Sequence, residues 1–282
     1  LLDANLPDND DKWITERLYG GSSKDRIAQE IVLGIGGIRA LRALNIDVDV
    51  YHFNEGHAVF AGIELIREKM TNHGLTFEEA VSSVRKEIVF TTHTPVREGN
   101  EAHNHDLLKN MSSYNSLSNN QMVTIGGDPF NMTVAGLRLA KIANAVAKLH
   151  GKTSNRMWKD VSGKAMITSV TNGVHPGSWQ DKKIRQAYET NSDIWGTHMT
   201  GKSELLSKIY QQCGVTLDPN KILIGFARRA APYKRSDMIF RNLDIIEPYL
   251  RSGQIQLVFS GKAHPSDGAG KNIVANLVEM MK

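Results

Sequence analysis

Several cationic side chains crowd into residues 225–235, which read Gly-Phe-Ala-Arg-Arg-Ala-Ala-Pro-Tyr-Lys-Arg. An arginine offers a planar fork to two oxygens of an oxyanion, and a lysine adds a compact point charge. A helix that begins just beyond them would contribute unpaired backbone N–H groups. These residues therefore suit a phosphate site. The same residues also allow a solvated basic turn that pairs with Asp237 or Asp244, and the sequence alone favours neither reading.

A second group of polar residues follows apolar, strand-like runs. The runs are Asp47–Phe53, Glu87–Thr92 and Met166–Val170, and the polar residues after them are Asn54–His57, His93 and Asn172. Ligands of open parallel sheets bind beyond the carboxyl ends of the strands. The basic residues Arg228–Lys234 follow the run Ile222–Phe226 in the same way, so we expect all of these residues to share one cleft.

The elements that must position these residues alternate between strands and helices. Residues 222–226 predict a buried strand, 236–250 a helix, and 254–260 the next strand, which together make a right-handed βαβ crossover. Residues 130–150 have a helical period, and residues 176–201 read as polar and irregular. The pattern predicts an α/β fold.

Two other motifs carry less chemistry. The run Gly34-Ile-Gly-Gly-Ile-Arg39 lacks the third glycine of a dinucleotide fingerprint and follows a helical segment, so close helix packing is the better interpretation. The cluster His103-Asn-His105-Asp106 could ligate a metal, but no second cluster completes a tetrahedral set. We predict no metal site.

Composition limits the classes of function. The chain has 34 Lys and Arg against 30 Asp and Glu, which gives a modest net charge of +4. The basic residues are scattered along the sequence, which argues against nucleic-acid binding. No apolar run is long enough to span a membrane, and the single Cys213 cannot form an internal disulfide. We expect a cytoplasmic protein.

Collinear motifs give the sequence a specific resemblance. These motifs are His52–His57, Phe90–Pro95, Asn144–His150, Thr171–His175, the basic segment at 228–235, and Gly261–Pro265. In this order they resemble the α-glucan phosphorylases, particularly the short bacterial and archaeal branch. The resemblance implies a GT-B fold, in which two Rossmann-like lobes enclose the active site in a cleft.

The resemblance also implies roles for individual residues. Arg229 and Lys234 would hold the substrate phosphate, and Arg228 would face the phosphate of pyridoxal 5′-phosphate (PLP). His93 would be the third catalytic residue and would hydrogen-bond the glucose at the cleavage point. Asn172 would hydrogen-bond the same glucose as a substrate-binding residue. The remaining substrate-binding residues implied are a carboxylate–histidine pair, Glu55 and His57, together with Asn144.

The reaction implied is retaining phosphorolysis of terminal α-1,4-glucosidic bonds, in which inorganic phosphate cleaves the glucan and glucose 1-phosphate is released. The PLP phosphate would serve as proton partner of the substrate phosphate. The PLP-anchoring lysine of the family lies in a Gly/Thr/Ser-rich motif that does not occur here. Lys141 and Ala145 also depart from the pattern of the classical glycogen enzymes.

The resemblance therefore covers part of each lobe. Residues 1–175 would form the C-terminal half of the N-terminal lobe, on the glucan side of the cleft. Residues 176–282 would form linker helices and the start of the C-terminal lobe, on the phosphate and PLP side. We expect a fragment that is inactive as it stands, and its capacity to form homo-oligomers is open.

Two alternatives remain. A nucleotide-sugar-dependent glucan synthase shares the GT-B fold and a basic pair for phosphate, although His57, His93 and Asn172 favour a phosphorylase. A non-catalytic glucan-binding protein could keep the cleft without the cofactor. A complete reading frame without a PLP lysine would favour that second alternative.

Overall fold

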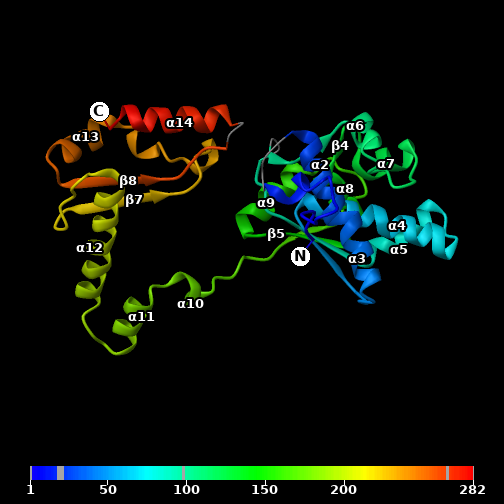
Figure 1. Ribbon diagram of the computed structural model, residues 1–282, viewed down its shortest axis with the longest axis horizontal. Coiled ribbons are helices and arrows are strands. Elements are labelled where there is room, and N and C mark those ends of the chain that lie inside the picture. The colour runs from blue at the N-terminus through cyan, green and yellow to red at the C-terminus, as the bar shows by residue number, and fades with distance from the viewer. Residues whose placement is uncertain (1, 18–21, 97–98, 265–266, 282) are drawn as a thin grey trace. The chain divides into compact units, whose positions relative to one another are not determined.

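A computed structural model describes residues 2–17, 22–96, 99–264 and 267–281. The chain divides into two compact units, Leu1–Gly173 and Val174–Lys282, and Figure 1 labels many of their elements. Pro265, the last residue of one motif noted above, lies outside the described residues.

The first unit is built on a four-stranded parallel sheet in the order β1-β2-β5-β6. Its strands are β1 (Tyr51–Asn54), β2 (Ile88–Thr92), β5 (Ile142–Ala145) and β6 (Ile167–Ser169). The predicted strands at 47–53, 87–92 and 166–170 are confirmed, each somewhat shorter than expected. Because all four strands are parallel, their carboxyl ends lie along one edge, which we call the carboxyl edge.

Helices and two short strands complete this unit. They are α1 (Trp13–Glu16), α2 (Ser23–Ile31), the π-helix η1 (Val32–Gly36), α3 (Gly37–Ala43), the 3₁₀-helix η2 (Gly56–Ala58), α4 (Phe60–His73), α5 (Phe77–Arg85), β3 (Ala102–His103), α6 (His105–Asn110), α7 (Asn119–Gly126), β4 (Phe130–Asn131), α8 (Met132–Leu139) and α9 (Lys148–Met157). Local sequence sets several of their ends. At α5, for example, Thr76 and Glu79 form a reciprocal capping box.

The core of the first unit lies between the sheet and these helices. Phe53 of β1 and Phe90 of β2 are buried with Phe60 of α4 and Leu137 of α8. Burial of such side chains is the main favourable term in folding. The sheet edge that carries the polar residues therefore stands on a well-packed base.

The prediction of one helical segment over residues 130–150 was wrong. That stretch contains β4, α8, β5 and the start of α9. Its small residues do mark close packing, since Ala143 and Ala145 are fully buried, but they are buried in a strand paired on both sides. The spacing of apolar residues fits a single helix, but the chain forms the helix α8 and then the central strand β5.

A buried carboxylate joins several segments of the first unit. Glu64 of α4 is inaccessible to solvent, and it accepts hydrogen bonds from Arg39 (Nε to Oε1, 3.0 Å), from Arg67 (Nη2 to Oε1, 2.6 Å) and from Asn115. Burial opposes its ionisation, but these hydrogen bonds outweigh burial and lower the pKa of Glu64 to about 2. Glu64 is therefore an ionised anchor for α3, α4 and the loop after α6.

The second unit contains a two-stranded parallel sheet. Strand β7 (Ile222–Ala227) pairs with β8 (Ile255–Ser260), with Ile222 opposite Ile255 and Ala227 opposite Ser260. Helix α12 lies on one side of this pair and α14 on the other in Figure 1. The two strands of the predicted βαβ crossover, and their parallel pairing, are confirmed.

The helices of the second unit differ from the sequence expectation. They are α10 (Pro176–Trp179), α11 (Lys182–Glu189), α12 (Ile194–Cys213), the 3₁₀-helices η4 (Pro232–Lys234) and η5 (Met238–Phe240), α13 (Leu243–Arg251) and α14 (Gly268–Glu279). The region 176–201, read as irregular, is thus largely helical. The predicted helix over 236–250 is shorter, because η5 precedes a regular helix that begins only at Leu243.

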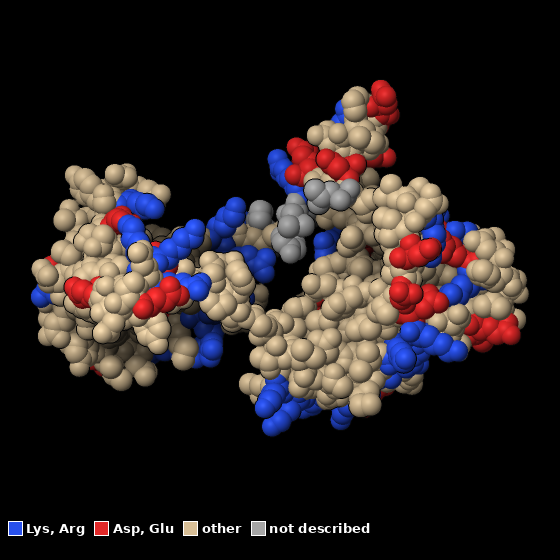
Figure 2. Space-filling model, turned by 90° about the horizontal axis from the view of Figure 1, so that it is seen from below, with Lys and Arg blue, Asp and Glu red and all other residues tan. Residues whose placement is uncertain are grey.

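Parallel sheets with helical connections make this a mixed α/β chain consistent with a Rossmann-like fold. The two-lobed GT-B arrangement stays a prediction. Among the described residues, none of the helices combines the length and the apolar character needed to cross a bilayer. Figure 2 shows basic and acidic side chains interspersed on the visible face.

Candidate active site

The predicted polar residues of the first unit do follow its parallel strands. Glu55 comes directly after β1, His93 after β2, and Asn172 after β6. Backbone pairing continues beyond the strands: Glu55 donates its N–H to the carbonyl of Thr91 (2.8 Å), and Asn172 donates to the carbonyl of Val146 (3.1 Å). The carboxyl edge therefore gathers these three residues, whereas Arg228–Lys234 follow β7 in the second unit, and a cleft shared by both groups stays a prediction.

Glu55 is joined to the segment that leaves β2. Its Oε1 accepts a hydrogen bond from the backbone N–H of His93 and another from Oγ1 of Thr94 (3.0 Å). The side chain of His93 is exposed, and no polar partner for its imidazole is found among the described residues. The ring is thus available to a ligand while its backbone is held.

Glu55 and His57, both expected beside the same sugar, do not bond to each other, and their contacts with a sugar stay predictions. His57 lies on the 3₁₀-helix η2, and its Nδ1 is 3.4 Å from Oε2 of Glu101, while Arg26 also contacts the ring. Glu55 points instead to His93. The backbone changes direction at Glu55, which has a φ of 69°, and the 3₁₀-helix η2 begins at the next residue, so residues two apart in sequence reach different partners.

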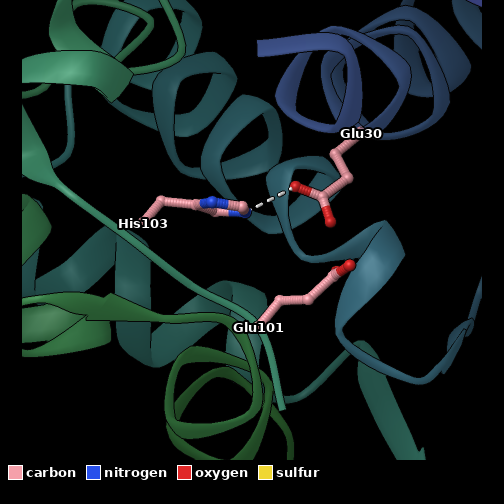
Figure 3. A group of neighbouring side chains, drawn as sticks. All are labelled: Glu30, Glu101 and His103. Atoms are coloured by element: carbon pink, nitrogen blue, oxygen red, sulfur yellow. Dashed lines mark hydrogen bonds and ion pairs between the residues drawn. The ribbon is translucent and has the colours of Figure 1, made fainter. Parts of the chain in front are cut away.

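His57 borders a cluster of charged residues that the sequence did not reveal. Glu30 of α2, Glu101 and His103 lie together in Figure 3, and their candidate ligand atoms are all within 4.8 Å of one another. Nε2 of His103 is 2.9 Å from Oε2 of Glu30. The members come from segments more than seventy residues apart, which explains why sequence spacing gave no signal.

Arg26 supplies the positive charge beside this cluster. Its Nε donates to Oε1 of Glu101 (2.6 Å) and lies 3.6 Å from Oε1 of Glu30. A side chain of the chain itself thus offsets the carboxylate charge, which favours an internal ion cluster over a metal centre.

Burial makes the protonation of this cluster unusual. Burial, followed by the hydrogen bond and the charge of Glu101, raises the pKa of Glu30 to about 10. Burial acts in the same sense on Glu101, but hydrogen bonds from His57, Glu30 and Arg26 outweigh it and lower the pKa of Glu101. Burial lowers the pKa of His103. At neutral pH the two carboxyl groups therefore share one proton.

The other histidine of the considered metal motif has separate partners. Nδ1 of His105 is 2.8 Å from the hydroxyl of Tyr114, and its Nε2 is 2.8 Å from the carbonyl of Gly127. These bonds occupy both ring nitrogens. His105 is therefore a structural residue and does not extend the cluster around His103.

Asn144 lies in the middle of the sheet. Its Oδ1 accepts a hydrogen bond from Oγ1 of Thr91 (2.8 Å), and Thr91 is in turn 2.6 Å from Nε2 of His52. This chain of hydrogen bonds crosses β1, β2 and β5 just before the carboxyl edge. The amide oxygen of Asn144 thus accepts a hydrogen bond from within the sheet. A contact between Asn144 and a substrate stays a prediction.

The cations of the second unit lie beyond the carboxyl end of β7. Arg228 and Arg229 are exposed, and Tyr233 and Lys234 form the 3₁₀-helix η4 with Pro232. Nη2 of Arg229 is 3.5 Å from the Tyr233 hydroxyl, and Nζ of Lys234 lies 4.5 Å from the centre of the Tyr233 ring. Tyr233 therefore stands between two of the cations.

Two expectations about this segment can be compared with the geometry. No regular α-helix begins beside the cations, because two 3₁₀-helices precede α13, so the helix N-terminus expected there is not found. Among the described residues, no ion pair links Arg228, Arg229 or Lys234 to a carboxylate, including Asp237 and Asp244. The donors of these cations remain available to an anion.

The chain after β8 holds the cation segment in place. The backbone N–H of Ala230 donates to the carbonyl of Lys262 (3.0 Å), and the N–H of Arg228 donates to the carbonyl of Ser260 (3.0 Å). Gly261 packs directly on Arg228, since a Cβ at this glycine would lie 2.1 Å from the Arg228 carbonyl oxygen. The Gly261 and Arg228 motifs are therefore neighbours through their backbones.

Comparison with known proteins was made over the whole chain. It is 33% identical over 328 residues to the maltodextrin phosphorylase of Thermococcus litoralis, covering 99% of this chain and 39% of that protein. It is 35% identical to the glycogen phosphorylase of Mycobacterium tuberculosis (99% and 40%) and 30% identical to that of Aquifex aeolicus (100% and 49%). No family profile matches. The chain therefore spans about half or less of the length of these relatives.

Proposed function

The chain is homologous, over almost its whole length, to part of the maltodextrin and glycogen phosphorylases, and on this premise we propose that it is part of an α-glucan phosphorylase. The proposed reaction is phosphorolysis of terminal α-1,4-glucosidic bonds, which releases glucose 1-phosphate. Similarity across 99% of the chain is the observation that carries the proposal. The activity belongs to the complete protein.

The second unit would provide the phosphate side of the site. Arg229 and Lys234 follow a parallel strand, have no carboxylate partner among the described residues, and are spaced by Tyr233. Bidentate and point-charge donors of this kind suit a phosphate dianion. Their role would be to bind inorganic phosphate and to stabilise its charge as the glycosidic bond breaks.

The first unit would provide the sugar side. His93 and Asn172 are exposed at the carboxyl edge, where their side chains could replace hydrogen bonds that the glucose loses on leaving water. In a GT-B enzyme the two units would belong to opposite lobes, with the change of lobe near residue 176. This assignment would bring sugar and phosphate residues to one cleft, and it rests on the homology.

PLP is the cofactor that such an enzyme requires. Arg228 suits the cofactor phosphate, because it is exposed and has no ion-pair partner among the described residues, while the anchoring lysine would lie outside this chain. PLP would supply a phosphate group that exchanges a proton with the substrate phosphate. Arg228 would offset the repulsion between two phosphates brought close together.

These groups together support retaining phosphorolysis. Arg229 and Lys234 would orient the substrate phosphate so that it protonates the glycosidic oxygen and then captures the glucosyl group on the same face. His93 and Asn172 would keep the sugar in place while positive charge develops at its anomeric carbon. A cytoplasmic location and the oligomeric state stay predictions.

The test uses the protein encoded by the complete reading frame. It is incubated with maltodextrin and inorganic phosphate, with and without added PLP, and glucose 1-phosphate is measured. A parallel reaction without phosphate reports free glucose. We expect glucose 1-phosphate only when phosphate is present, and more of it when PLP is added to cofactor-depleted protein.

Three outcomes would contradict the proposal. Glucose release without phosphate would indicate a hydrolase. Glucan binding without product, combined with glucosyl transfer from a nucleotide sugar, would indicate a synthase, and binding with neither reaction would indicate a non-catalytic glucan-binding protein.

A further inference from the structure

We infer that Glu55 is a positioning residue, which holds the backbone of His93 so that the imidazole faces the sugar, and does not itself bind the substrate. This inference rests on the proposed function and assigns Glu55 a role other than a substrate contact. Its basis is that Oε1 of Glu55 accepts two hydrogen bonds from the chain itself, from the His93 backbone N–H and from Thr94 Oγ1.

The parallel pairing of β1 and β2 brings the two segments together. Asn54 is opposite Thr91 in the register, and the N–H of Glu55 donates to the Thr91 carbonyl at 2.8 Å. The ladder thus continues one residue past the end of β1. From that point the Glu55 side chain needs to reach only the two residues that follow Thr92.

The backbone of Glu55 supports a specific role for its side chain. Its φ is 69° and its ψ is −178°, a combination that glycine adopts readily and other residues adopt rarely. A glutamate there adopts a conformation that costs free energy, whereas a glycine would not. The unfavourable backbone therefore agrees with a functional role for the Glu55 side chain.

The backbone and the side chain of His93 have different surroundings, which also fits a positioning role for Glu55. The backbone N–H of His93 is bound by Glu55, whereas its imidazole is exposed and has no polar partner within the described part of the chain. Holding the backbone fixes where the ring begins without occupying its nitrogens. A misplacement of about 1 Å in such a group can cost roughly a hundredfold in rate.

The experiment compares three variants in the complete protein. Glu55→Gly removes the carboxylate and suits the local φ, so it should fold at least as well as the wild type. Glu55→Gln keeps an oxygen that can accept from His93. Glu78→Gly would disturb a helix, so Glu78→Gln, at an exposed position of α5, is the control for lost charge.

Two measurements are made on each variant. Hydrogen exchange at the His93 amide reports the backbone bond directly. Steady-state kinetics give kcat and the KM values for maltodextrin and phosphate. For Glu55→Gly we expect at least about tenfold faster exchange at His93 and a fall of roughly a hundredfold in kcat/KM for maltodextrin, with the phosphate KM little changed. In Glu55→Gln, slow exchange at the His93 amide and most of the wild-type kcat/KM should be restored. The melting temperature of Glu55→Gly should not fall below that of the wild type.

The results separate this inference from its rivals. Unchanged His93 exchange in Glu55→Gly would overturn it. Equal losses of activity in Glu55→Gln and Glu55→Gly, with His93 exchange normal in Glu55→Gln, would indicate direct contact with the sugar instead. If the wild type makes no glucose 1-phosphate, the proposed function fails, and the exchange measurement still decides whether Glu55 holds His93.

Discussion

The hydroxyl of Tyr233 lies 3.5 Å from Nη2 of Arg229, at the long limit of a hydrogen bond. The Tyr233 ring also lies under Nζ of Lys234. Burial acts to raise the pKa of Tyr233, but Arg229 and Lys234 outweigh it and lower this pKa. Tyr233 therefore spaces the two cations that we propose for phosphate.

This relationship predicts a graded effect of substitutions at Tyr233. Tyr233→Phe keeps the ring under Lys234 and loses only a long hydrogen bond, so we expect the phosphate KM to rise about twofold to fivefold, within the range of a weak hydrogen bond. Tyr233→Leu also removes the cation–π contact with Lys234 and should raise the phosphate KM further. Initial rates at varied phosphate measure both, and equal effects would contradict a spacing role of the ring.

Removing either proposed phosphate cation should weaken phosphate binding selectively. Hydrogen bonds to charged groups are worth about 1.5–3 kcal/mol, so Arg229→Ala or Lys234→Ala should raise the phosphate KM by roughly 10- to 100-fold. Arg241→Ala, at an exposed position beyond η5, is the matched control. Phosphate kinetics equal to those of the control would remove both residues from the site.

Substitution of the sugar-side residues should have the opposite selectivity. We expect His93→Ala and Asn172→Ala each to lower kcat/KM for maltodextrin by roughly tenfold or more, because a hydrogen bond to the glucose is lost. Binding of inorganic phosphate should change little. His73→Ala, at the exposed end of α4, is the control, and wild-type rates in either variant would contradict the assignment.

The Glu64 anchor should make stability depend on pH. Its folded-state pKa of about 2 is below the ordinary value of 4.5, so ionised Glu64 stabilises the fold above about pH 4.5, and this contribution is lost as the pH falls towards 2. Glu64→Gln should lower the free energy of unfolding by about 2 kcal/mol at pH 7.

Urea unfolding of wild type and Glu64→Gln across this pH range provides the measurement. The difference between the two proteins should shrink as the pH falls from 5 to about 2, where the wild-type carboxylate is half protonated. Glu78→Gln, an exposed change of the same chemistry, should show little difference at any pH. A difference independent of pH would show that Glu64 acts through packing alone.

The glycine run after α2 should tolerate a methyl group at one position and not at another. A Cβ at Gly34 would lie 2.6 Å from the backbone nitrogen of Ala61, so Gly34→Ala should destabilise the protein by about 1–3 kcal/mol. At Gly36 the nearest atom would be 3.9 Å away, so Gly36→Ala should be neutral or slightly stabilising. Thermal unfolding tests the contrast, and equal effects would contradict the packing interpretation.

Local pattern predicted most strands, since apolar runs at 87–92 and 254–260 stand out from their neighbours. It missed β5, because Ile142–Ala145 consists mostly of small residues within a longer helical period. That strand owes its conformation to β2 and β6, which pair with it on either side. Pairing partners far away in sequence cannot be inferred from the strand itself.

The candidate site was predictable to the same extent. Polar residues after parallel strands were expected to lie together, and Glu55 and His93 do meet at the carboxyl edge. The cluster of Glu30, Glu101 and His103 was not expected, because α2 supplies Glu30 from outside the sheet. His57, two residues from Glu55, contacts Glu101 and Arg26, and its expected place beside the sugar stays a prediction.

The close approach of Gly261 to the Arg228 carbonyl has a consequence for sequence variation. Even an alanine methyl would overlap that oxygen, so the first residue of the loop after β8 cannot change without displacing the first proposed cation. In a library carrying every substitution, position 261 should be depleted of all replacements under selection for growth on maltodextrin. The exposed neighbour Lys262, whose backbone carbonyl makes the contact to Ala230, should accept many.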